Sequence, residues 1–349
     1  MAELELFHGG ALEQAMVRYG PQAEGWIDLS TGLNPWPWPV ERAGTLSDMG
    51  LTSLPETAAR CRLEVAAAAC YGISPKACVV AAPGAQALIQ CLPYLDLPGE
   101  NLAEVAVVAP TYEEHAACWR RAGHKVCEVN SPEEADSYDV IIVVNPNNPD
   151  GRLFEPQYLL SLADRQADRG GMLVVDEAFA DGDTALSCAS GAGQPGLCVL
   201  RSFGKFFGLG GLRLGFALTH KGLAESLRGI LGPWAVSGPA VAIGCRALAD
   251  KRWIEETNRR LCRESDKLAA ALRRMGFHCV GATRFFQLIN VDNGGQNGGQ
   301  TAKDLHEHLA HRGILTRRFE HWPHWLRIGL LPHAPGLERL VKALEAWHQ

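Results

Sequence analysis

The stretch that decides the fold is Asp139-Val-Ile-Ile-Val-Val-Asn-Pro-Asn-Asn-Pro-Asp-Gly151. Its apolar residues at 140–144 show no polar alternation, which is typical of a strand buried on both faces. The Asn and Pro residues that follow favour a turn and end the strand. A strand of this kind belongs in a parallel sheet that helices cover on both sides.

The segments on either side of residues 139–151 alternate between strand and helix patterns. Short apolar runs bounded by turn residues predict strands, and longer segments that end at glycine predict helices. This alternation predicts an α/β fold with a mostly parallel sheet and helices on both faces. The expected strands are 77–82, 104–109, 139–144, 172–175, 197–201 and 212–218, and the expected helices are 55–72, 85–95, 112–122 and 155–169.

The pattern changes after residue 220. We expect a long helix over 253–275, followed by a smaller α+β unit. Its expected elements are the strand 284–291, the helix 301–312, the strands 314–318 and 325–330, and the helix 337–347. The first 40 residues have little periodicity and predict an extended arm. The sequence therefore predicts an N-terminal arm over 1–40, a large α/β domain over 41–240 and a small α+β domain over 241–349.

The composition argues against several classes of protein. Of the 349 residues, 33 are basic and 39 are acidic, and the net charge of −6 disfavours a nucleic-acid-binding surface. The sequence has no apolar run long enough to span a membrane, and its acidic start is unlike a signal peptide. The 11 cysteines lack Cys-x-x-Cys spacing, so we expect reduced thiols in a cytoplasmic protein. His306, His308 and His311 lack zinc-motif spacing, so we expect no metal site.

Polar motifs follow the ends of several expected strands. Ligands of an open parallel sheet bind at the carboxyl ends of its strands, so these motifs are expected to converge on one crevice. Each motif taken alone is more typical of a turn or a helix cap. The motifs are Gly84-Ala85-Gln86, Thr111-Tyr112, Asn145-Pro-Asn-Asn-Pro-Asp-Gly151, Asp176-Glu-Ala-Phe179 and Ser202-Phe-Gly-Lys205.

Lys205 is the most informative residue of these motifs. The chain uses 25 arginines but only 8 lysines, and Lys205 lies in the apolar, glycine-rich segment Ser202-Phe-Gly-Lys-Phe-Phe-Gly208. A desolvated lysine has a lowered pKa and can act as an amine nucleophile that forms a Schiff base. The alternative is a lysine whose stem covers apolar surface. A P-loop does not fit because position 199 is Val, and a dinucleotide fingerprint does not fit because position 213 is Arg.

The order of these motifs resembles that of the fold-type-I pyridoxal-phosphate enzymes of aminotransferase class I/II. Within them, the sequence is most similar to the threonine-phosphate decarboxylases of the cobalamin pathway, which are related to the histidinol-phosphate aminotransferases. The resemblance covers about residues 8–330. The family resemblance rests on four motifs: Asn145-Pro-Asn-Asn-Pro149, Val174-Val-Asp-Glu-Ala-Phe179, Ser202-Phe-Gly-Lys205 and Gly211-Leu-Arg-Leu-Gly215. Three further segments favour the decarboxylases: Phe7-His8-Gly9-Gly10, Asp28-Leu-Ser-Thr-Gly-Leu-Asn34-Pro35 and Gly232-Pro-Trp-Ala-Val-Ser-Gly-Pro239.

The resemblance implies a role for each motif toward pyridoxal 5'-phosphate (PLP). Lys205 would hold the cofactor as a Schiff base, and Asp176 would pair with the protonated pyridine nitrogen. Asn148 would bond the ring hydroxyl, and Tyr112 would stack on the ring. The cofactor phosphate would lie at a helix start, among Gly84, Ala85, Gln86, Ser202 and Arg213.

The same resemblance implies how substrate is recognised. Arg327 matches the arginine that binds the substrate carboxylate, and His8 and Asn34 are the expected N-terminal contributors. Two positions depart from the family pattern. Phe179 lacks the hydroxyl of the usual tyrosine, and Leu54 replaces a tyrosine that reaches the cofactor phosphate of the partner subunit. A homodimer is still expected.

The resemblance implies decarboxylation of L-threonine O-3-phosphate to aminopropanol phosphate. The bond at Cα that stands perpendicular to the cofactor ring decides between decarboxylation and amino transfer, and sequence does not give that orientation. An aminotransferase acting on histidinol phosphate, or on a similar phosphorylated amino compound, is therefore the alternative. A non-catalytic phosphate-binding module is the third reading, which the absent P-loop and dinucleotide motifs disfavour. The expected partner is a small phosphorylated amino acid, with neither nucleic acid nor membrane involved.

Overall fold

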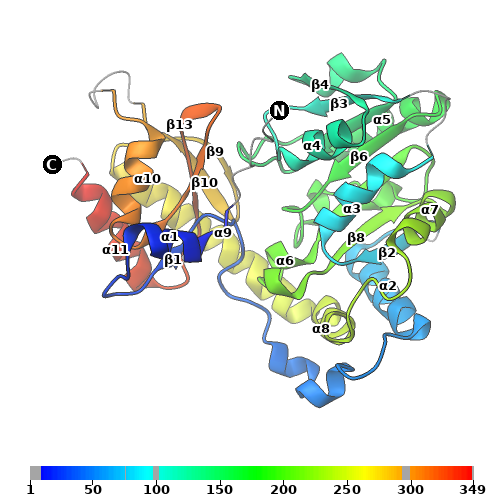
Figure 1. Cartoon of the computed structure of the whole chain (residues 1–349), viewed down its shortest axis with the longest axis horizontal. Helices are drawn as coiled ribbons and strands as arrows, with labels where there is room; N and C mark the ends of the chain where they lie inside the picture. Colours follow the sequence, from blue (N-terminus) through cyan, green and yellow to red (C-terminus); the bar gives the residue numbers. More distant parts are fainter. Residues whose placement is uncertain (1–8, 75, 97–101, 293–298, 348–349) are drawn as a thin grey trace. The chain divides into compact units, whose positions relative to one another are not determined.

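The computed structural model describes residues 9–74, 76–96, 102–292 and 299–347 (Figure 1). The chain divides into two compact units. We call Pro37–Asn148 with Arg152–Asn258 the sheet unit, and Met1–Trp36 with Pro149–Gly151 and Arg259–Gln349 the terminal unit. The boundaries expected at residues 40 and 240 stay a prediction, because compactness alone does not establish which parts fold independently.

The sheet unit is built on a seven-stranded sheet with the order β2-β8-β7-β6-β5-β3-β4. Strand β8 is antiparallel to both of its neighbours, and the other adjacent strands are parallel. All five residues of β5 are buried, as the apolar run predicts. The strands are β2 (Cys78–Ala82), β3 (Glu104–Val108), β4 (Lys125–Val129), β5 (Val140–Val144), β6 (Met172–Asp176), β7 (Leu197–Ser202) and β8 (Gly215–Thr219).

Helices cover both faces of this sheet. Side chains of α3, α4 and α7 pack in one apolar core with alternate strand residues, among them Val174 and Leu200. On the opposite face, the Tyr71 ring of α2 packs against Phe216 of β8 at a centroid distance of 5.9 Å. The helices of the unit are α2 (Thr57–Tyr71), α3 (Ala85–Cys91), α4 (Glu114–Arg121), α5 (Pro156–Asp168), α6 (Phe203–Phe206), α7 (Lys221–Leu231) and α8 (Gly238–Ala249).

The strand register places the polar motifs at one edge of the sheet. Gly215, the first residue of β8, pairs with both Ala82 and Ser202, the last residues of β2 and β7. Val144 at the end of β5 pairs with Asp176 at the end of β6. The carboxyl ends of these four strands therefore lie together, as the doubly wound α/β arrangement requires.

The terminal unit contains segments from both ends of the chain. Strand β1 (Ile27–Asp28) pairs in parallel with β11 (Ile314–Leu315). A separate antiparallel sheet has the order β12-β13-β10-β9. Its strands are β9 (His278–Thr283), β10 (Phe286–Asn290), β12 (Arg317–Phe319) and β13 (Trp322–Gly329). The helices are α1 (Leu12–Tyr19), α10 (Ala302–Ala310), α11 (Ala334–Glu345) and the part of α9 (Lys251–Arg274) that follows Asn258.

The predicted fold class is confirmed, and most of the expected strands and helices lie within a few residues of their positions. The extended conformation predicted for residues 1–40 is wrong for α1, whose eight residues are too few to show clear periodicity. The single strand predicted over 314–318 is two strands in different sheets. The sequence prediction also missed β4, β9, α7 and α8. Strand β4 pairs only at the sheet edge, where a continuous apolar run is not required.

Two further features concern the chain as a whole. All eleven cysteines are free thiols, and only Cys61 and Cys262 among them are exposed. In the part of the chain that the structure describes, no helix combines the length and apolarity needed to cross a bilayer.

Candidate functional site

Lys205 lies on the short helix α6, directly after β7. The aromatic residues Phe203, Phe206 and Phe207 around it are fully buried or nearly so, and Lys205 itself is half-buried. Its Nζ atom lies 5.3 Å from the ring centroid of Phe179, the position at which the sequence departs from the family pattern. A primary amine held in an apolar frame at a strand end suits a nucleophile.

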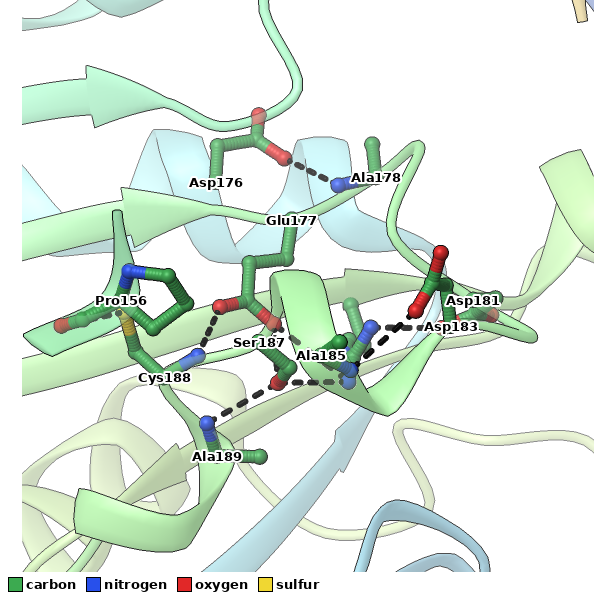
Figure 2. Close-up of polar contacts among 11 residues, drawn as sticks. Pro156, Asp176, Glu177, Ala178, Asp181, Asp183, Ala185, Ser187, Cys188 and Ala189 are labelled. Atoms are coloured by element: carbon green, nitrogen blue, oxygen red, sulfur yellow. Dashed lines mark hydrogen bonds and ion pairs between the residues drawn. The ribbon is translucent and has the colours of Figure 1, made fainter. Parts of the chain in front are cut away.

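Asp176 is held from two sides at the end of β6. Its Oδ1 accepts a hydrogen bond from the Ala178 amide at 3.0 Å (Figure 2). Its Oδ2 lies 2.9 Å from Nε2 of His115, a residue of α4 that is completely buried. Only 4% of Asp176 is exposed. The carboxylate therefore has a fixed orientation, which is what pairing with a protonated ring nitrogen requires.

His115 was not among the residues singled out from the sequence. It lies three residues after Tyr112, and the two rings make an edge contact with centroids 6.1 Å apart. A histidine three positions after a strand-end tyrosine, in the first turn of the expected helix 112–122, was the signal available in the sequence. That signal was weak because nothing local links position 115 to position 176.

Gly84 and Arg213 lie close together at the start of α3. Gly84 has φ +92°, and a Cβ atom there would lie 2.7 Å from Nη2 of Arg213. Gly215 likewise lets the chain approach Ala85, because a Cβ at Gly215 would lie 2.4 Å from the Ala85 nitrogen. A guanidinium packed over a glycine at a helix start suits a phosphate group, and Ser202 lies at the same sheet edge. These residues fit the phosphate end of PLP.

A hydrogen-bonded chain orients Tyr112. The Tyr112 hydroxyl donates to Oε1 of Gln86 at 3.1 Å, and Nε2 of Gln86 donates to Glu114 at 2.9 Å. Glu114 is buried and also accepts a weak bond from the Cys118 thiol at 3.6 Å. The side chain of Gln86, a residue expected at the cofactor phosphate, therefore links Tyr112 to Glu114. Glu114 is a second residue that the sequence did not reveal.

Asn148 lies in the turn after β5, beside two asparagines whose side chains fix the turn. Asn147 accepts from the Thr111 hydroxyl and donates to the Pro110 carbonyl, both at 2.7 Å. Asn145 exchanges two hydrogen bonds with the main chain of Phe154, at 2.9 and 3.0 Å. The repeated asparagines of this motif therefore have different tasks, and Asn148 is held at the same sheet edge as Asp176.

Arg327 lies on β13 of the terminal unit and is 5% exposed. Its Nη2 donates to the carbonyl of Ser30, and its guanidinium lies 4.9 Å from the Phe286 ring centroid. Burial, with a contribution from Arg317 on the adjacent strand, lowers the pKa of Arg327 to about 9. A buried guanidinium whose cationic form is penalised in this way suits an anionic ligand.

The other residues expected at the substrate end have different surroundings. Both ends of the Asn34 amide bond the main chain of Trp36, at 2.9 and 3.0 Å, so this side chain shapes a turn. His8 lies outside the described residues. The glycines after it pack on Ser30, because the Gly10 amide donates to the Ser30 hydroxyl at 2.8 Å and a Cβ at Gly9 would lie 2.5 Å from the Ser30 carbonyl oxygen.

The sequence is similar to those of several curated proteins. Threonine-phosphate decarboxylase of Pseudomonas aeruginosa is 44% identical over 342 residues, which cover 97% of each chain. The enzyme of the same name from a Sinorhizobium species is 40% identical and also covers 97% of each chain. Histidinol-phosphate aminotransferase of Geotalea uraniireducens is 28% identical over 92% of this chain and 91% of its own.

Solved structures show the same fold. Histidinol-phosphate aminotransferase from Clostridium acetobutylicum superposes with a TM-score of 0.80 at 20% identity, covering 91% of this chain and 98% of its own. L-threonine-O-3-phosphate decarboxylase from Porphyromonas gingivalis gives a TM-score of 0.75 at 21% identity, covering 92% and 98%. The family model described as aminotransferase class I and II matches residues 26–344. The chain therefore belongs to the aminotransferase class I and II family.

Proposed function

We propose that the chain is a PLP-dependent carboxy-lyase that converts L-threonine O-3-phosphate to aminopropanol phosphate, a step of cobalamin biosynthesis. The single observation that carries this choice is the similarity, at 44% and 40% identity over nearly the whole length, to two proteins named threonine-phosphate decarboxylase. The site geometry supports the cofactor: Lys205 lies in an apolar frame, and Asp176 is fixed by His115 and Ala178.

Each side chain of the site has a proposed task. Lys205 would bind the cofactor covalently and be released as a free amine when the substrate amine takes its place. Asp176 would keep a proton on the pyridine nitrogen, because a fixed carboxylate stabilises the cationic ring. Tyr112, oriented through Gln86, would support the ring face, and Asn148 would bond the ring hydroxyl. Gly84, Ala85, Gln86, Ser202 and Arg213 would bind the cofactor phosphate.

PLP, when bound, supplies an electron-accepting ring that stabilises the charge left at Cα when a substituent departs. Which substituent departs depends on how the protein orients the substrate. Arg327 would bind the substrate carboxylate in a bidentate fork and so set that orientation, with His8 and Asn34 as further proposed contributors. The proposed assembly is a cytoplasmic homodimer.

The alternative is an aminotransferase acting on histidinol phosphate or a related phosphorylated amino compound, which the relatives at 28% identity favour. Product analysis separates the two. The protein, loaded with PLP, is incubated with L-threonine O-3-phosphate without any keto acid, and carbon dioxide and the phosphorylated amine are measured. Release of both in equal amounts supports the decarboxylase. Turnover only when a keto acid is added, with no carbon dioxide released, would support the aminotransferase.

A further inference from the structure

A cluster of charged side chains is buried on the far side of the strands that carry the candidate site. We call Glu177, Asp181, Ser187 and Arg201 the Arg201 cluster. Arg201 Nη1 donates to Asp181 at 3.0 Å, Nη2 donates to the Ser187 hydroxyl at 2.9 Å, and Nη2 also lies 3.4 Å from Glu177. The side chains of the three ionised residues are at most 3% exposed. Figure 2 shows Glu177 and Ser187 of this cluster beneath the strand that ends at Asp176.

Glu177 links β6 to the segment that contains Ser187 and Cys188. Its two carboxylate oxygens accept from the Ser187 hydroxyl at 2.7 Å and from the Cys188 amide at 2.6 Å. Burial raises the pKa of Glu177, and the Arg201 guanidinium and these hydrogen bonds oppose that rise. The guanidinium also lies 4.6 Å from the ring centroid of Tyr71 on α2. Arg201 is therefore fixed by contacts on several sides.

The cluster adjoins two residues of the candidate site in sequence. Glu177 follows Asp176, and Arg201 precedes Ser202. Successive side chains of an extended segment point to opposite faces. Figure 2 shows this at β6, where the Asp176 carboxylate lies on one side of the strand and the Glu177 side chain on the other. A change in the backbone dihedral angles at Glu177 would therefore reorient Asp176, and one at Arg201 would reorient Ser202.

Stability alone does not account for such a cluster. Buried ion pairs often contribute little to stability, because desolvation offsets the attraction, and well-packed apolar residues can replace them without loss. The cluster does provide directional contacts that hold β6 and β7 in one arrangement. These contacts add to those of the main chain, where β6 pairs with β7 up to Asp176 and Leu200 and the Glu177 amide donates to the Leu200 carbonyl at 2.9 Å.

We propose that Arg201 and Glu177 are positioning residues for the cofactor: from the opposite face of the sheet, they hold Asp176 and Ser202 where the pyridine nitrogen and the phosphate bind. This inference rests on the proposed function, because it assigns Asp176 and Ser202 to PLP. In this arrangement, Arg201 and Glu177 would act on the cofactor only through Asp176 and Ser202. Loosening the cluster would weaken cofactor binding even in a protein that remains folded.

The test compares cofactor affinity with fold stability in four proteins. Arg201→Lys keeps the charge but loses the planar fork, and Ser187→Ala removes one hydroxyl at little change in volume. Arg228→Lys is the matched control, because Arg228 is a half-buried arginine of the same unit that bonds Glu64 at 3.2 Å and the Val79 carbonyl at 2.7 Å, away from the sheet edge of the site. PLP is titrated into each apoprotein by absorbance, well below its melting temperature.

We expect the dissociation constant for PLP to rise about tenfold in Arg201→Lys and about threefold in Ser187→Ala, in line with loss of charge-assisted hydrogen bonds. We expect Arg228→Lys to lower the melting temperature without changing the dissociation constant. The pH at which the absorbance band of bound PLP changes should also shift in Arg201→Lys and stay constant in the control.

Equal PLP affinity in the wild type, Arg201→Lys and Ser187→Ala would overturn the positioning role and leave the proposed function intact. If Arg201→Lys does not fold, the result for Ser187→Ala decides in the same way. A wild-type protein that binds no PLP would instead overturn the proposed function, and this inference with it.

Discussion

Nε2 of His115 lies 2.9 Å from Oδ2 of Asp176, and both side chains are buried. His115 comes from the first turn of α4 and Asp176 from the end of β6, so the contact fixes one helix to the strand that carries the proposed partner of the cofactor ring. A charge-assisted contact of this kind is worth about 1.5–3 kcal/mol when one partner is removed.

Replacing His115 by Phe should therefore reduce turnover about tenfold or more, because Asp176 loses a partner that orients it. The measurement is kcat for carbon dioxide release, with the absorbance spectrum of bound cofactor as a function of pH. His124→Phe is a useful control, because His124 bonds the Pro93 carbonyl and the Ala103 amide rather than the site. An unchanged spectrum and kcat in His115→Phe would show that Ala178 alone suffices to hold Asp176.

Asp176→Asn should reduce turnover much more strongly while leaving the fold intact. The amide is nearly isosteric with the carboxylate but cannot supply the anion that keeps the pyridine nitrogen protonated. Turnover and cofactor content are measured together, with circular dichroism to verify the fold. Turnover close to that of the wild type, with cofactor bound, would remove Asp176 from the proposed role.

Lys205 should be the residue that binds the cofactor covalently. Borohydride reduction of the PLP-loaded protein, followed by proteolysis and mass spectrometry, should find the label on the peptide that contains Lys205. Lys221, which is exposed and forms a surface ion pair with Glu225, serves as an internal control for nonspecific labelling. Label on any lysine other than Lys205, in stoichiometric amount, would contradict the assignment.

Arg327→Lys should weaken substrate affinity and slow turnover, with little effect on PLP binding. A lysine keeps the charge but cannot offer the two parallel hydrogen bonds of a guanidinium to a carboxylate. The measurements are KM and kcat for L-threonine O-3-phosphate and the dissociation constant for PLP. Identical substrate kinetics in the variant and the wild type would remove Arg327 from the proposed substrate site, although it would keep its contacts with Ser30 and Phe286.

His306 should make the stability of the terminal unit depend on pH. Burial, with a contribution from Arg318, lowers the pKa of His306 from 6.5 to about 4, and its Nδ1 lies 3.0 Å from the Thr316 hydroxyl. Arg18 also opposes protonation, and Glu307 favours it. At a pH between about 4 and 6.5, His306 is protonated in the unfolded chain but neutral in the folded one. The free energy of unfolding should therefore fall as the pH is lowered from 6.5 toward 4.

The size of this effect is at most about 3 kcal/mol, since one unit of pKa shift corresponds to about 1.4 kcal/mol. Urea unfolding at pH 5 and pH 7.5, in the wild type and in His306→Gln, measures it. We expect the difference in unfolding free energy between the two pH values to be smaller in the variant. An equal difference in the two proteins would assign the pH dependence to other groups.

The sequence was sufficient to predict the elements whose signals are local. The apolar run at 140–144 gave a fully buried strand, and the polar motifs after β2, β5, β6 and β7 do lie at one sheet edge. Apolar runs and turn residues act over a few positions, so a single sequence carries them. The motifs also sufficed to recognise the family, because their order along the chain is itself the evidence.

Contacts between distant segments could not be predicted in this way. Gln86 was expected at the cofactor phosphate, and nothing in the sequence indicated that its side chain links Tyr112 to Glu114. His115 was not expected near the site, yet its Nε2 lies 2.9 Å from Oδ2 of Asp176. In each case the hydrogen-bond partner depends on which groups the fold brings near the polar side chain. A buried polar side chain then forms hydrogen bonds with those groups.

The sequence by itself therefore determined the α/β architecture, the family and the residue types available for PLP chemistry. Only the tertiary structure decided how those residues are supported: His115 against Asp176, the Arg213 guanidinium over Gly84, and the Arg201 cluster beneath β6 and β7. The physical reason is the range of the interactions. Patterning reflects each residue's preference for water or core, whereas the direction of a buried side chain is set by partners that the strand register brings from dozens of residues away.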